Sequence, residues 1–227
     1  MKIVAFTGAG ISKESGIKTF RDDDGLWNNY SIKDVATLEG WGKNPQKVLD
    51  FYNERKSEMS SVEPNKAHRY LSKLEGKHDV TVITQNVDDL HERSGSSNVL
   101  HLHGEMKKMR SSEYEDLLYD YNKDIKLGDK CEQGFQLRPH VVFFGENPYN
   151  VEESYKALED CDLLLIIGTS LQITYTLNLL SSIDEEKTEV IYIDPEPDDF
   201  MDGITHVTYI KENATTGVGK IVEELLK

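Results

Sequence analysis

The sequence of 227 residues predicts an α/β fold with a mostly parallel sheet, helices on both faces and a small inserted lobe. Short apolar runs rich in β-branched residues recur along the chain, and helical patterns lie between several of them. This alternation is typical of a parallel sheet covered on both sides. Two long stretches interrupt it and predict the inserted lobe. With 37% hydrophobic residues the chain can bury a full core, and we expect one domain over residues 1–227.

The expected strands are six apolar runs, at residues 3–6, 80–84, 99–102, 140–144, 163–167 and 190–193. Two helices have N-cap residues. One begins after Asn44, with Pro45 in its first position, and extends to residue 59; the next follows Asn65 and ends at Leu74. Apolar spacing predicts three further helices, at residues 151–158, 177–183 and 219–226.

The inserted lobe is expected from two stretches that break the alternation. Residues 20–60 contain no second strand of the sheet, and residues 105–137 are polar and charged without a long apolar face. We expect insertions at about 28–60 and 105–137 to build the small lobe, with a ligand cleft between it and the sheet.

Composition excludes several classes of function. The 41 acidic residues outnumber the 26 basic ones and give a net charge of −15, which repels the phosphate backbone of nucleic acids. Such a surface suits basic peptides, or serves only solubility. Two cysteines make no disulfide framework, and the longest apolar run, at 163–167, is too short to cross a bilayer. We expect a soluble cytoplasmic monomer without nucleic-acid or membrane partners.

A glycine turn, Thr7-Gly8-Ala9-Gly10, follows the first strand. Two glycines there permit a tight turn and close approach to a pyrophosphate, which would make the sheet Rossmann-like. The usual fingerprint has a third glycine three residues later, where this chain has Lys13. The turn alone therefore supports nucleotide binding and a ligand-free turn about equally.

Six motifs occur in a fixed order: GAGIS, GIKTFRDDDGLW, TQNVDDLHERSG, HLHGE, RPHVVFFGE and GTSL. Together they closely resemble the sirtuins, the NAD-dependent protein-lysine deacylases, from Lys2 to the last helix. The resemblance implies NAD as cosubstrate and acylated lysine side chains of proteins or peptides as partners. It also implies nicotinamide, O-acyl-ADP-ribose and free lysine as products.

The resemblance assigns catalytic roles to His103, Asn86 and Asp88. His103 would be the base that takes a proton from a ribose hydroxyl, because an imidazole titrates near neutral pH. Asn86 and Asp88 would line the nicotinamide pocket. Without the resemblance, a lone histidine at a strand end is more often structural, and an Asn-containing segment is often only a polar turn. His101 receives no role.

The cofactor contacts that the resemblance implies come from four parts of the chain. Gln85 would touch the ribose, Phe20 would shield the reactive carbon, and Arg21 would help to order a loop that closes over NAD. The full expected set is Gly8, Ala9, Gly10, Phe20, Arg21, Gln85, Thr169, Ser170 and Asp194. Asp194 stands where the family usually has Asn, and its carboxylate cannot donate a hydrogen bond to the ribose, so we expect weaker NAD binding.

In sirtuins the acylated peptide adds as a strand between two segments, so main-chain hydrogen bonds supply affinity. The matching segments here are Val142, Phe144, Gly145 and Glu146, and the stretch after Ser170. Val142 and Phe144 are expected to form walls for the lysine stem. Val141 and Phe143 are expected in the core.

Tyr52 and Arg55 lie three residues apart on one helix face. Taken alone, this pattern indicates a solvated face on which Arg55 pairs with a carboxylate such as Glu58. In sirtuins that remove acidic acyl groups, a Tyr-x-x-Arg pair at this point binds the distal carboxylate, and Ala36 matches a small residue that leaves room for the longer chain. The resemblance thus implies succinyl-, malonyl- or glutaryl-lysine as substrates, with acetyl-lysine also accepted.

Two departures from the family stand out. Most sirtuins hold a structural zinc with four cysteines, but where those cysteines would fall this chain has only Cys131, and one thiol cannot make a tetrahedral site. We expect no zinc and a lobe held by packing, with Tyr114, Leu117 and Tyr119 turned inward. In the segment after GTSL, Tyr175 replaces a usual proline.

Other functions are compatible with the same NAD pocket. The chain could be an NAD hydrolase or mono-ADP-ribosyltransferase, or a silent NAD-binding module. Joint presence of Asn86, Asp88 and His103 disfavours the silent module, and the FGE segment with the Tyr52 and Arg55 pair favours the deacylase over NAD hydrolysis.

Overall fold

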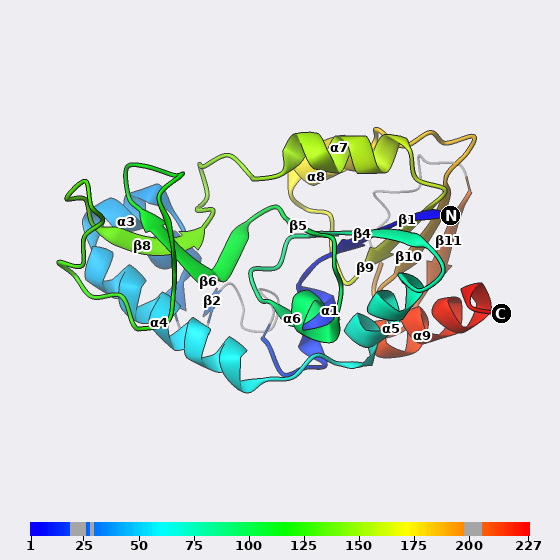
Figure 1. Cartoon of the computed structure of the whole chain (residues 1–227), viewed down its shortest axis with the longest axis horizontal. Helices are drawn as coiled ribbons and strands as arrows, with labels where there is room; N and C mark the ends of the chain where they lie inside the picture. Colours follow the sequence, from blue (N-terminus) through cyan, green and yellow to red (C-terminus); the bar gives the residue numbers. More distant parts are fainter. Residues whose placement is uncertain (19–25, 28–29, 198–205) are drawn as a thin grey trace.

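The structure, a computed structural model, describes residues 1–18, 26–27, 30–197 and 206–227. Its main sheet has six parallel strands in the order β11-β10-β9-β1-β4-β5 (Figure 1). Their bounds are β1 Lys2–Thr7, β4 Asp79–Thr84, β5 Val99–His101, β9 Leu163–Ile167, β10 Glu189–Ile193 and β11 Val207–Ile210. The chain moves from β1 to β4 and β5, then returns to β9 on the other side of β1. The carboxyl ends of β1 and β9 therefore flank the topological switch point where such sheets bind ligands.

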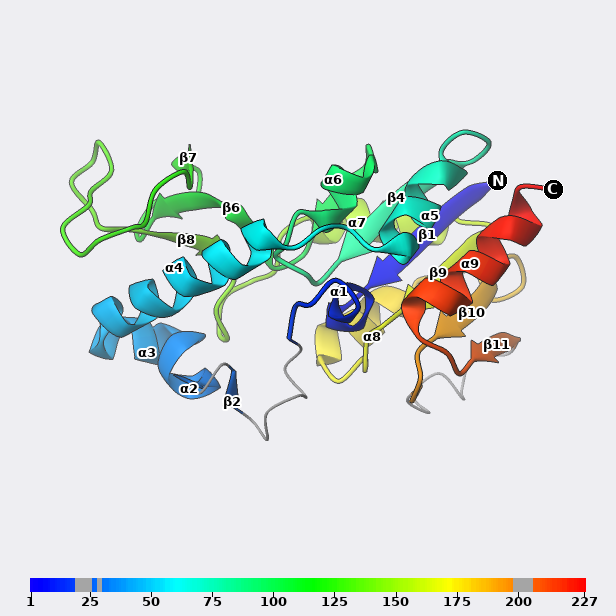
Figure 2. The same cartoon turned by 90° about the horizontal axis from the view of Figure 1, so that it is seen from below.

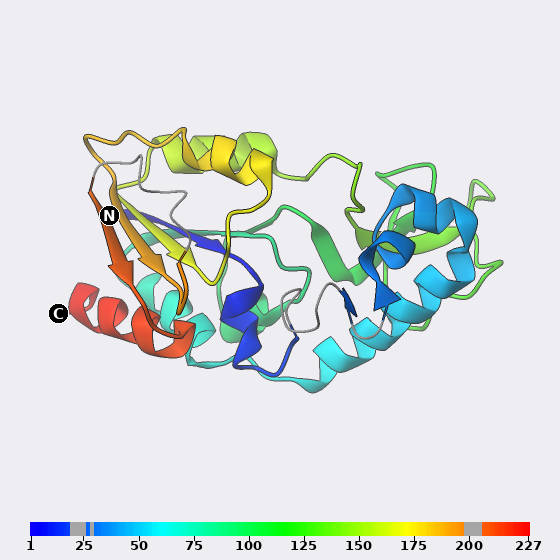
Figure 3. The ribbon, with the colours of Figure 1, turned by 180° about the vertical axis from the view of Figure 1, so that it is seen from behind.

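Helices cover both faces of this sheet (Figures 1 and 3). On one face, α5 (Lys66–Leu74) and α9 (Ala214–Leu225) pack on a core that includes Ile3, Leu165 and Val218. On the other, α7 (Val151–Glu159) and α8 (Thr174–Leu180) pack on Phe6, Leu164 and Ile166. Every residue of β9 is buried, because a parallel strand between two helical layers has no solvent face.

A second group of elements lies at the far end of the molecule (Figures 1 and 2). It contains a three-stranded antiparallel sheet in the order β7-β6-β8, a short β2–β3 ribbon and three helices with their own core. The bounds are β2 Leu26–Trp27, β3 Tyr30–Ser31, α2 Ile32–Val35, α3 Leu38–Lys43, α4 Pro45–Ser61, β6 Gly104–Ser111, β7 Leu118–Asp120 and β8 Leu137–Val141. The predicted fold class is thereby confirmed. The single domain over residues 1–227 stays a prediction.

Both predicted helix caps are present. The Asn44 side chain accepts a hydrogen bond from the Lys47 amide at 3.1 Å, and the Asn65 side chain accepts one from the Ala67 amide at 2.9 Å. Each bond satisfies a first-turn N–H group that has no partner within its helix.

Several boundaries differ from the prediction. The run at 140–144 was expected in the main sheet, but β8 spans Leu137–Val141 and pairs antiparallel with β6. A run of apolar residues indicates that a strand is buried, but it does not indicate which sheet the strand belongs to. Strand β11 was missed because it is a partly exposed edge strand, and β6 was missed because polar residues alternate along it. Helices α8 and α9 begin three and five residues before their predicted starts.

The place of the family's zinc cysteines is filled by a small hydrogen-bonded turn. Ser111 Oγ lies 3.4 Å from Cys131 Sγ and accepts bonds from the amides of Glu113 and Tyr114. Within the described ranges, no group of three or more His, Cys, Asp or Glu side chains is arranged to hold a metal ion. Leu117 and Tyr119 pack partly on the lobe core as expected, whereas Tyr114 is 44% exposed and lies edge-on to the Phe135 ring at its surface.

Among the described helices, none combines the length and the apolar character needed to cross a membrane.

Two further short helices are α1 (Ala9–Lys13), which follows the glycine turn, and α6 (Leu90–Ser94), which follows the TQNVDD segment.

A pair of buried histidines makes stability depend on pH. His68 on α5 is fully buried, its ring lies 4.9 Å from that of His91, and burial lowers the His68 pKa to about 4. The unfolded chain takes up this proton near pH 6.5 and the folded chain only near pH 4. Stability from neutral His68 is therefore complete above pH 6.5 and is lost as the pH falls towards 4.

When the pH falls from 7 to 5, the unfolding free energy of each protein decreases. We expect this decrease to be about 2 kcal/mol smaller in His68→Leu than in the wild type. Urea unfolding of both proteins at the two pH values measures this difference. An identical loss in both proteins would show that His68 is not the linked group.

Candidate active site

The glycine turn after β1 packs directly on the turn after β9. Gly8 N donates to Ile167 O at 3.0 Å, and Gly10 N donates to Gly168 O at 2.8 Å. A Cβ on Gly10 would lie 2.6 Å from Gly168 Cα, and one on Gly8 would lie 2.7 Å from Thr169 Cβ. Contact between the two turns thus already explains both glycines. Their spacing carries no separate argument for a phosphate.

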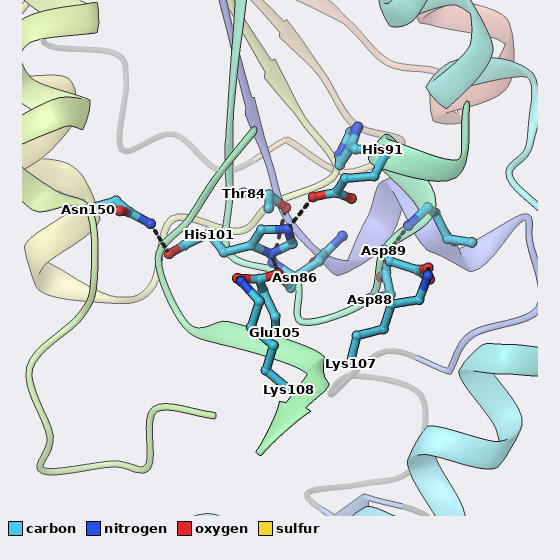
Figure 4. A network of polar contacts seen from close by, with 12 residues as sticks. Thr84, Asn86, Asp88, Asp89, His91, His101, Glu105, Lys107, Lys108 and Asn150 are labelled. Carbon is cyan, nitrogen blue, oxygen red and sulfur yellow. Dashed lines mark hydrogen bonds and ion pairs between the residues drawn. The ribbon is translucent and has the colours of Figure 1, made fainter. Parts of the chain in front are cut away.

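A buried chain of hydrogen bonds joins this turn to the segment after β4. Asn86 Nδ2 donates to Gly8 O at 3.1 Å and to Ser12 Oγ at 3.2 Å, and Ser12 Oγ donates to Asp88 Oδ2 at 3.0 Å. Figure 4 shows Asn86 and Asp88 on this segment. Burial raises the pKa of Asp88, while hydrogen bonds from the Leu90 amide and Ser12 oppose the rise. Asn86 and Asp88 were expected here, whereas the link through Ser12, which lies inside the GAGIS motif, was not.

His103 is held in one tautomer. Its Nδ1 lies 2.8 Å from Gln85 O, and because a carbonyl only accepts, Nδ1 carries the proton. Nε2 is then left with its lone pair. Burial lowers the His103 pKa below its usual value, and the Gln85 carbonyl partly opposes this. His103 is therefore neutral near pH 7, as a base must be, and Nε2 faces the Tyr175 hydroxyl at 2.5 Å.

His101, two residues earlier, has the opposite environment (Figure 4). Nδ1 contacts Asn86 O and Nε2 contacts Glu92 Oε1, both at 2.8 Å. Burial disfavours its charged form, but the hydrogen bond and charge of Glu92 outweigh burial and raise the His101 pKa. Both ring nitrogens are thus occupied, and the Nδ1 contact holds the Asn86 backbone in place.

Gln85 and the GTSL segment supply groups that fit a ribose. Thr169 Oγ1 donates to Gln85 Oε1 at 3.3 Å, whereas Gln85 Nε2 is buried and has no partner among the described residues. A buried amide donor without a protein partner fits a ligand oxygen. Ser170 is partly buried beside it, and Asp194 directly follows β10, with its Oδ1 accepting from the Glu196 amide at 2.9 Å. Ala9 is partly exposed at the start of α1. Phe20 and Arg21 lie outside the described residues.

The expected peptide segment lies between the two groups of elements. Val142 N donates to His103 O at 2.9 Å, and Phe144 N donates to Ala36 O at 2.8 Å. Phe144 is 56% exposed, so its ring is available to a ligand, while Val141 and Phe143 are buried as expected. Gly145 has φ +98°, which permits the turn that follows.

The Glu146 carboxylate bonds to groups inside the protein. Its Oε1 accepts from Arg110 Nη2 and Arg138 Nη1, both at 2.8 Å, and its Oε2 accepts from Phe143 N at 2.7 Å. The carboxylate therefore faces inward, because it neutralises two buried guanidinium groups. Only the Glu146 backbone is left to contact a peptide.

Tyr52 and Arg55 are both 1% exposed, so the alternative of a solvated helix face is wrong. Tyr52 stacks on Phe143, with ring centroids 5.8 Å apart, and burial raises the Tyr52 pKa. Arg55 Nη1 donates to Glu58 Oε2 at 2.6 Å, which confirms that pairing. Arg55 also lines a pocket of about 450 Å³ together with Lys18, Glu54 and Glu58. Ala36, also buried, lies beside Phe144 through its carbonyl.

Comparisons with known proteins identify the family of the chain. The Sir2 family model matches residues 8–175. A Helicobacter pylori (strain ATCC 700392 / 26695) protein named NAD-dependent protein deacylase is 50% identical over 194 residues, which cover 86% of this chain and 84% of that protein. A crystal structure of a Sir2 homolog–NAD complex is 34% identical with a TM-score of 0.88, covering 99% of this chain and 89% of that chain.

A second solved structure contains a peptide. It is a Sir2 protein with a deacetylated p53 peptide and 3′-O-acetyl ADP-ribose, 29% identical with a TM-score of 0.82, covering 98% of this chain and 92% of that chain. The family match spans well over half of the chain, and the relatives match nearly all of it. The chain therefore belongs to the Sir2 family of NAD-dependent protein deacylases.

Proposed function

We propose that this enzyme removes acyl groups from protein lysine side chains and accepts succinyl, malonyl and glutaryl groups as well as acetyl. The observation that carries the acidic preference is the buried Arg55 guanidinium, which lines a pocket and follows the buried Tyr52 by three residues on the same helix. Burial lowers the Arg55 pKa, and the charges of Glu58 and, more weakly, Asp88 oppose this, so Arg55 lies within electrostatic range of a residue of the candidate nicotinamide site.

NAD, when bound, supplies the ribose carbon that the acyl oxygen attacks and the nicotinamide that leaves. Among the protein groups, Gln85 Nε2 is suited to donate to a ribose oxygen. Asn86 and Asp88 are suited to hold the nicotinamide amide, since their side chains are fixed by Ser12. His103 Nε2 is suited to take the ribose proton, and Gln85 O stabilises the imidazolium that results.

Recognition of an acidic acyl group follows from the chemistry of arginine. A guanidinium has five N–H donors in a planar fork that matches a carboxylate, and the interaction strengthens where water is excluded. Arg55 pairs with Glu58, whose side chain is 52% exposed. A succinyl carboxylate would bind the same guanidinium beside Glu58 or in its place. The Tyr52 ring and Ala36 would bound the acyl chain.

The peptide would lie along Phe144 and Gly145. Their exposure and the main-chain pairing of Phe144 with Ala36 support a strand-like binding site there. The peptide complex of the Sir2 relative supports the same class of partner.

We expect Arg55→Met to lower kcat/KM for a succinyl-lysine peptide by about 10- to 100-fold, since a charged hydrogen bond contributes about 1.5–3 kcal/mol. The acetyl form of the same peptide lacks the distal carboxylate and should change by less than about threefold. Mass spectrometry of both peptides with saturating NAD measures the two ratios, which are kcat/KM of the variant over that of the wild type for each peptide.

Lys47→Met is the matched control, because it also removes a cation from helix α4. Lys47 pairs with Asp34 and does not line the pocket. It should leave both ratios unchanged. Equal losses for succinyl and acetyl peptides in Arg55→Met would contradict the acidic-acyl assignment.

A further inference from the structure

Tyr175, which replaces the proline usual in sirtuins, makes a direct contact with the candidate base. Its Oη lies 2.5 Å from His103 Nε2, and the two rings are nearly perpendicular at 82°. Because His103 Nδ1 donates to Gln85 O, Nε2 can only accept, and the phenol must be the donor. The Tyr175 proton therefore points at the same lone pair that a base uses.

The phenol is held by its surroundings. Tyr175 lies in the first turn of α8, and its ring packs against the buried cluster beneath α7 and α8. The GTSL turn that precedes it is braced, since Leu171 N donates to Thr169 Oγ1 at 3.3 Å and Tyr192 Oη donates to Thr169 O at 2.5 Å. The residues expected to contact NAD and the residue that contacts the base thus belong to one short, braced segment.

The hydroxyl has capacity for a second partner on the ligand side. A phenol oxygen donates one hydrogen bond and accepts up to two. Within the described part of the chain, the hydrogen-bond partner recorded for Tyr175 Oη is His103. The oxygen can therefore accept from a ribose hydroxyl while its own proton stays on the bond to Nε2.

We propose that Tyr175 is a catalytic residue that relays the proton of an NAD ribose hydroxyl to His103. This inference rests on the proposed role of His103 as the base. In the step, the ribose O–H bond breaks and its proton bonds to Tyr175 Oη, while the original phenol proton moves to His103 Nε2. The ribose oxygen keeps the electron pair with which it attacks the acyl carbon. Tyr175 ends neutral, and the positive charge lies on His103.

Two observations favour a relay over a phenol that merely blocks the base. Movement out of the way would require the ring to leave its packing on the α7–α8 cluster, whereas the relay needs no rearrangement. Burial also raises the Tyr175 pKa, so the phenol keeps its proton and remains a donor throughout the neutral pH range.

The test is Tyr175→Phe, which keeps the ring and removes the hydroxyl, with Tyr70→Phe as a matched control on α5. Two readouts are used. The first is the His103 pKa in the ligand-free enzyme, followed by NMR of labelled histidine. The second is kcat with a succinyl-lysine or acetyl-lysine peptide at saturating NAD.

The relay predicts that Tyr175→Phe raises the His103 pKa, because the variant loses a donor to the neutral imidazole. It also predicts that kcat falls by about 100-fold while KM for NAD changes little. Tyr70→Phe should change neither quantity. A kcat that is unchanged or higher in Tyr175→Phe overturns the relay, and a higher value would indicate a blocking phenol.

His103→Asn separates this inference from the function on which it rests. If His103→Asn stays active, the base assignment is wrong and the relay is wrong with it. If His103→Asn is inactive while Tyr175→Phe has full activity, the base assignment stands and the relay alone is wrong.

Discussion

Replacing His103 by asparagine is expected to lower kcat for deacylation by about 10²–10⁴-fold, the range typical of a lost general base. Asparagine can still donate to Gln85 O, but it offers no lone pair of comparable basicity at the position of Nε2. NAD binding should persist, because the expected cofactor contacts come from Gln85, Thr169 and the turn at Gly8 rather than from the imidazole.

The measurement combines kcat from mass spectrometry with NAD affinity from calorimetry. His78→Asn is the matched control, since His78 contacts Leu225 O at the opposite end of the sheet. It should leave both values unchanged. Full activity of His103→Asn with normal folding would contradict the assignment of His103 as the base.

Replacing Glu146 by alanine is expected to destabilise the protein by about 3–5 kcal/mol. The change leaves Arg110 and Arg138, both almost fully buried, without the carboxylate that bonds to each of them. It also removes the acceptor of the Phe143 amide, on whose ring the Arg138 guanidinium stacks at 3.6 Å. Because these groups cannot reach water, the cost of their desolvation is no longer offset.

Urea unfolding with circular dichroism measures this loss. Glu115→Ala is the control, because Glu115 also lies near Arg110, at 3.7 Å, but its side chain is 63% exposed. An exposed pair contributes about 0–1 kcal/mol. If the unfolding free energy fell no more in Glu146→Ala than in Glu115→Ala, the bonds of Glu146 to Arg110 and Arg138 would not be what holds the peptide segment in place.

The sequence predicted the main sheet well because its strands carry their signal locally. Continuous apolar runs such as Leu163–Ile167 are buried on both faces whatever their neighbours are. The caps at Asn44 and Asn65 are also local, since each bond spans two or three residues. β8 was assigned to the wrong sheet because its pairing with β6 depends on a contact between distant segments.

The site was predicted only in part for the same reason. Motif resemblance placed Asn86, Asp88 and His103 in one region, but it could not show that Ser12 joins the first two or that Tyr175, 72 residues away from His103, reaches its Nε2. Helical spacing put Tyr52 and Arg55 on one face, and only the folded structure, in which Tyr52 stacks on Phe143, shows that this face is buried.

Glu146 illustrates how a motif leaves the direction of a side chain open. The FGE segment matches a peptide-binding stretch, yet the direction of the Glu146 carboxylate is set by Arg110, which lies 36 residues earlier in the chain. Side-chain direction in an irregular segment follows from such partners, and the segment's own sequence does not contain them.

The most direct measurement of the central proposal uses the wild-type protein and one peptide that carries either succinyl-lysine or acetyl-lysine. Each form is incubated with and without NAD, and the peptide, nicotinamide and O-acyl-ADP-ribose are followed by mass spectrometry. We predict NAD-dependent loss of both groups, one nicotinamide per lysine released, and a higher kcat/KM for succinyl. Loss of acetyl alone, with succinyl untouched, would contradict the role proposed for Tyr52 and Arg55.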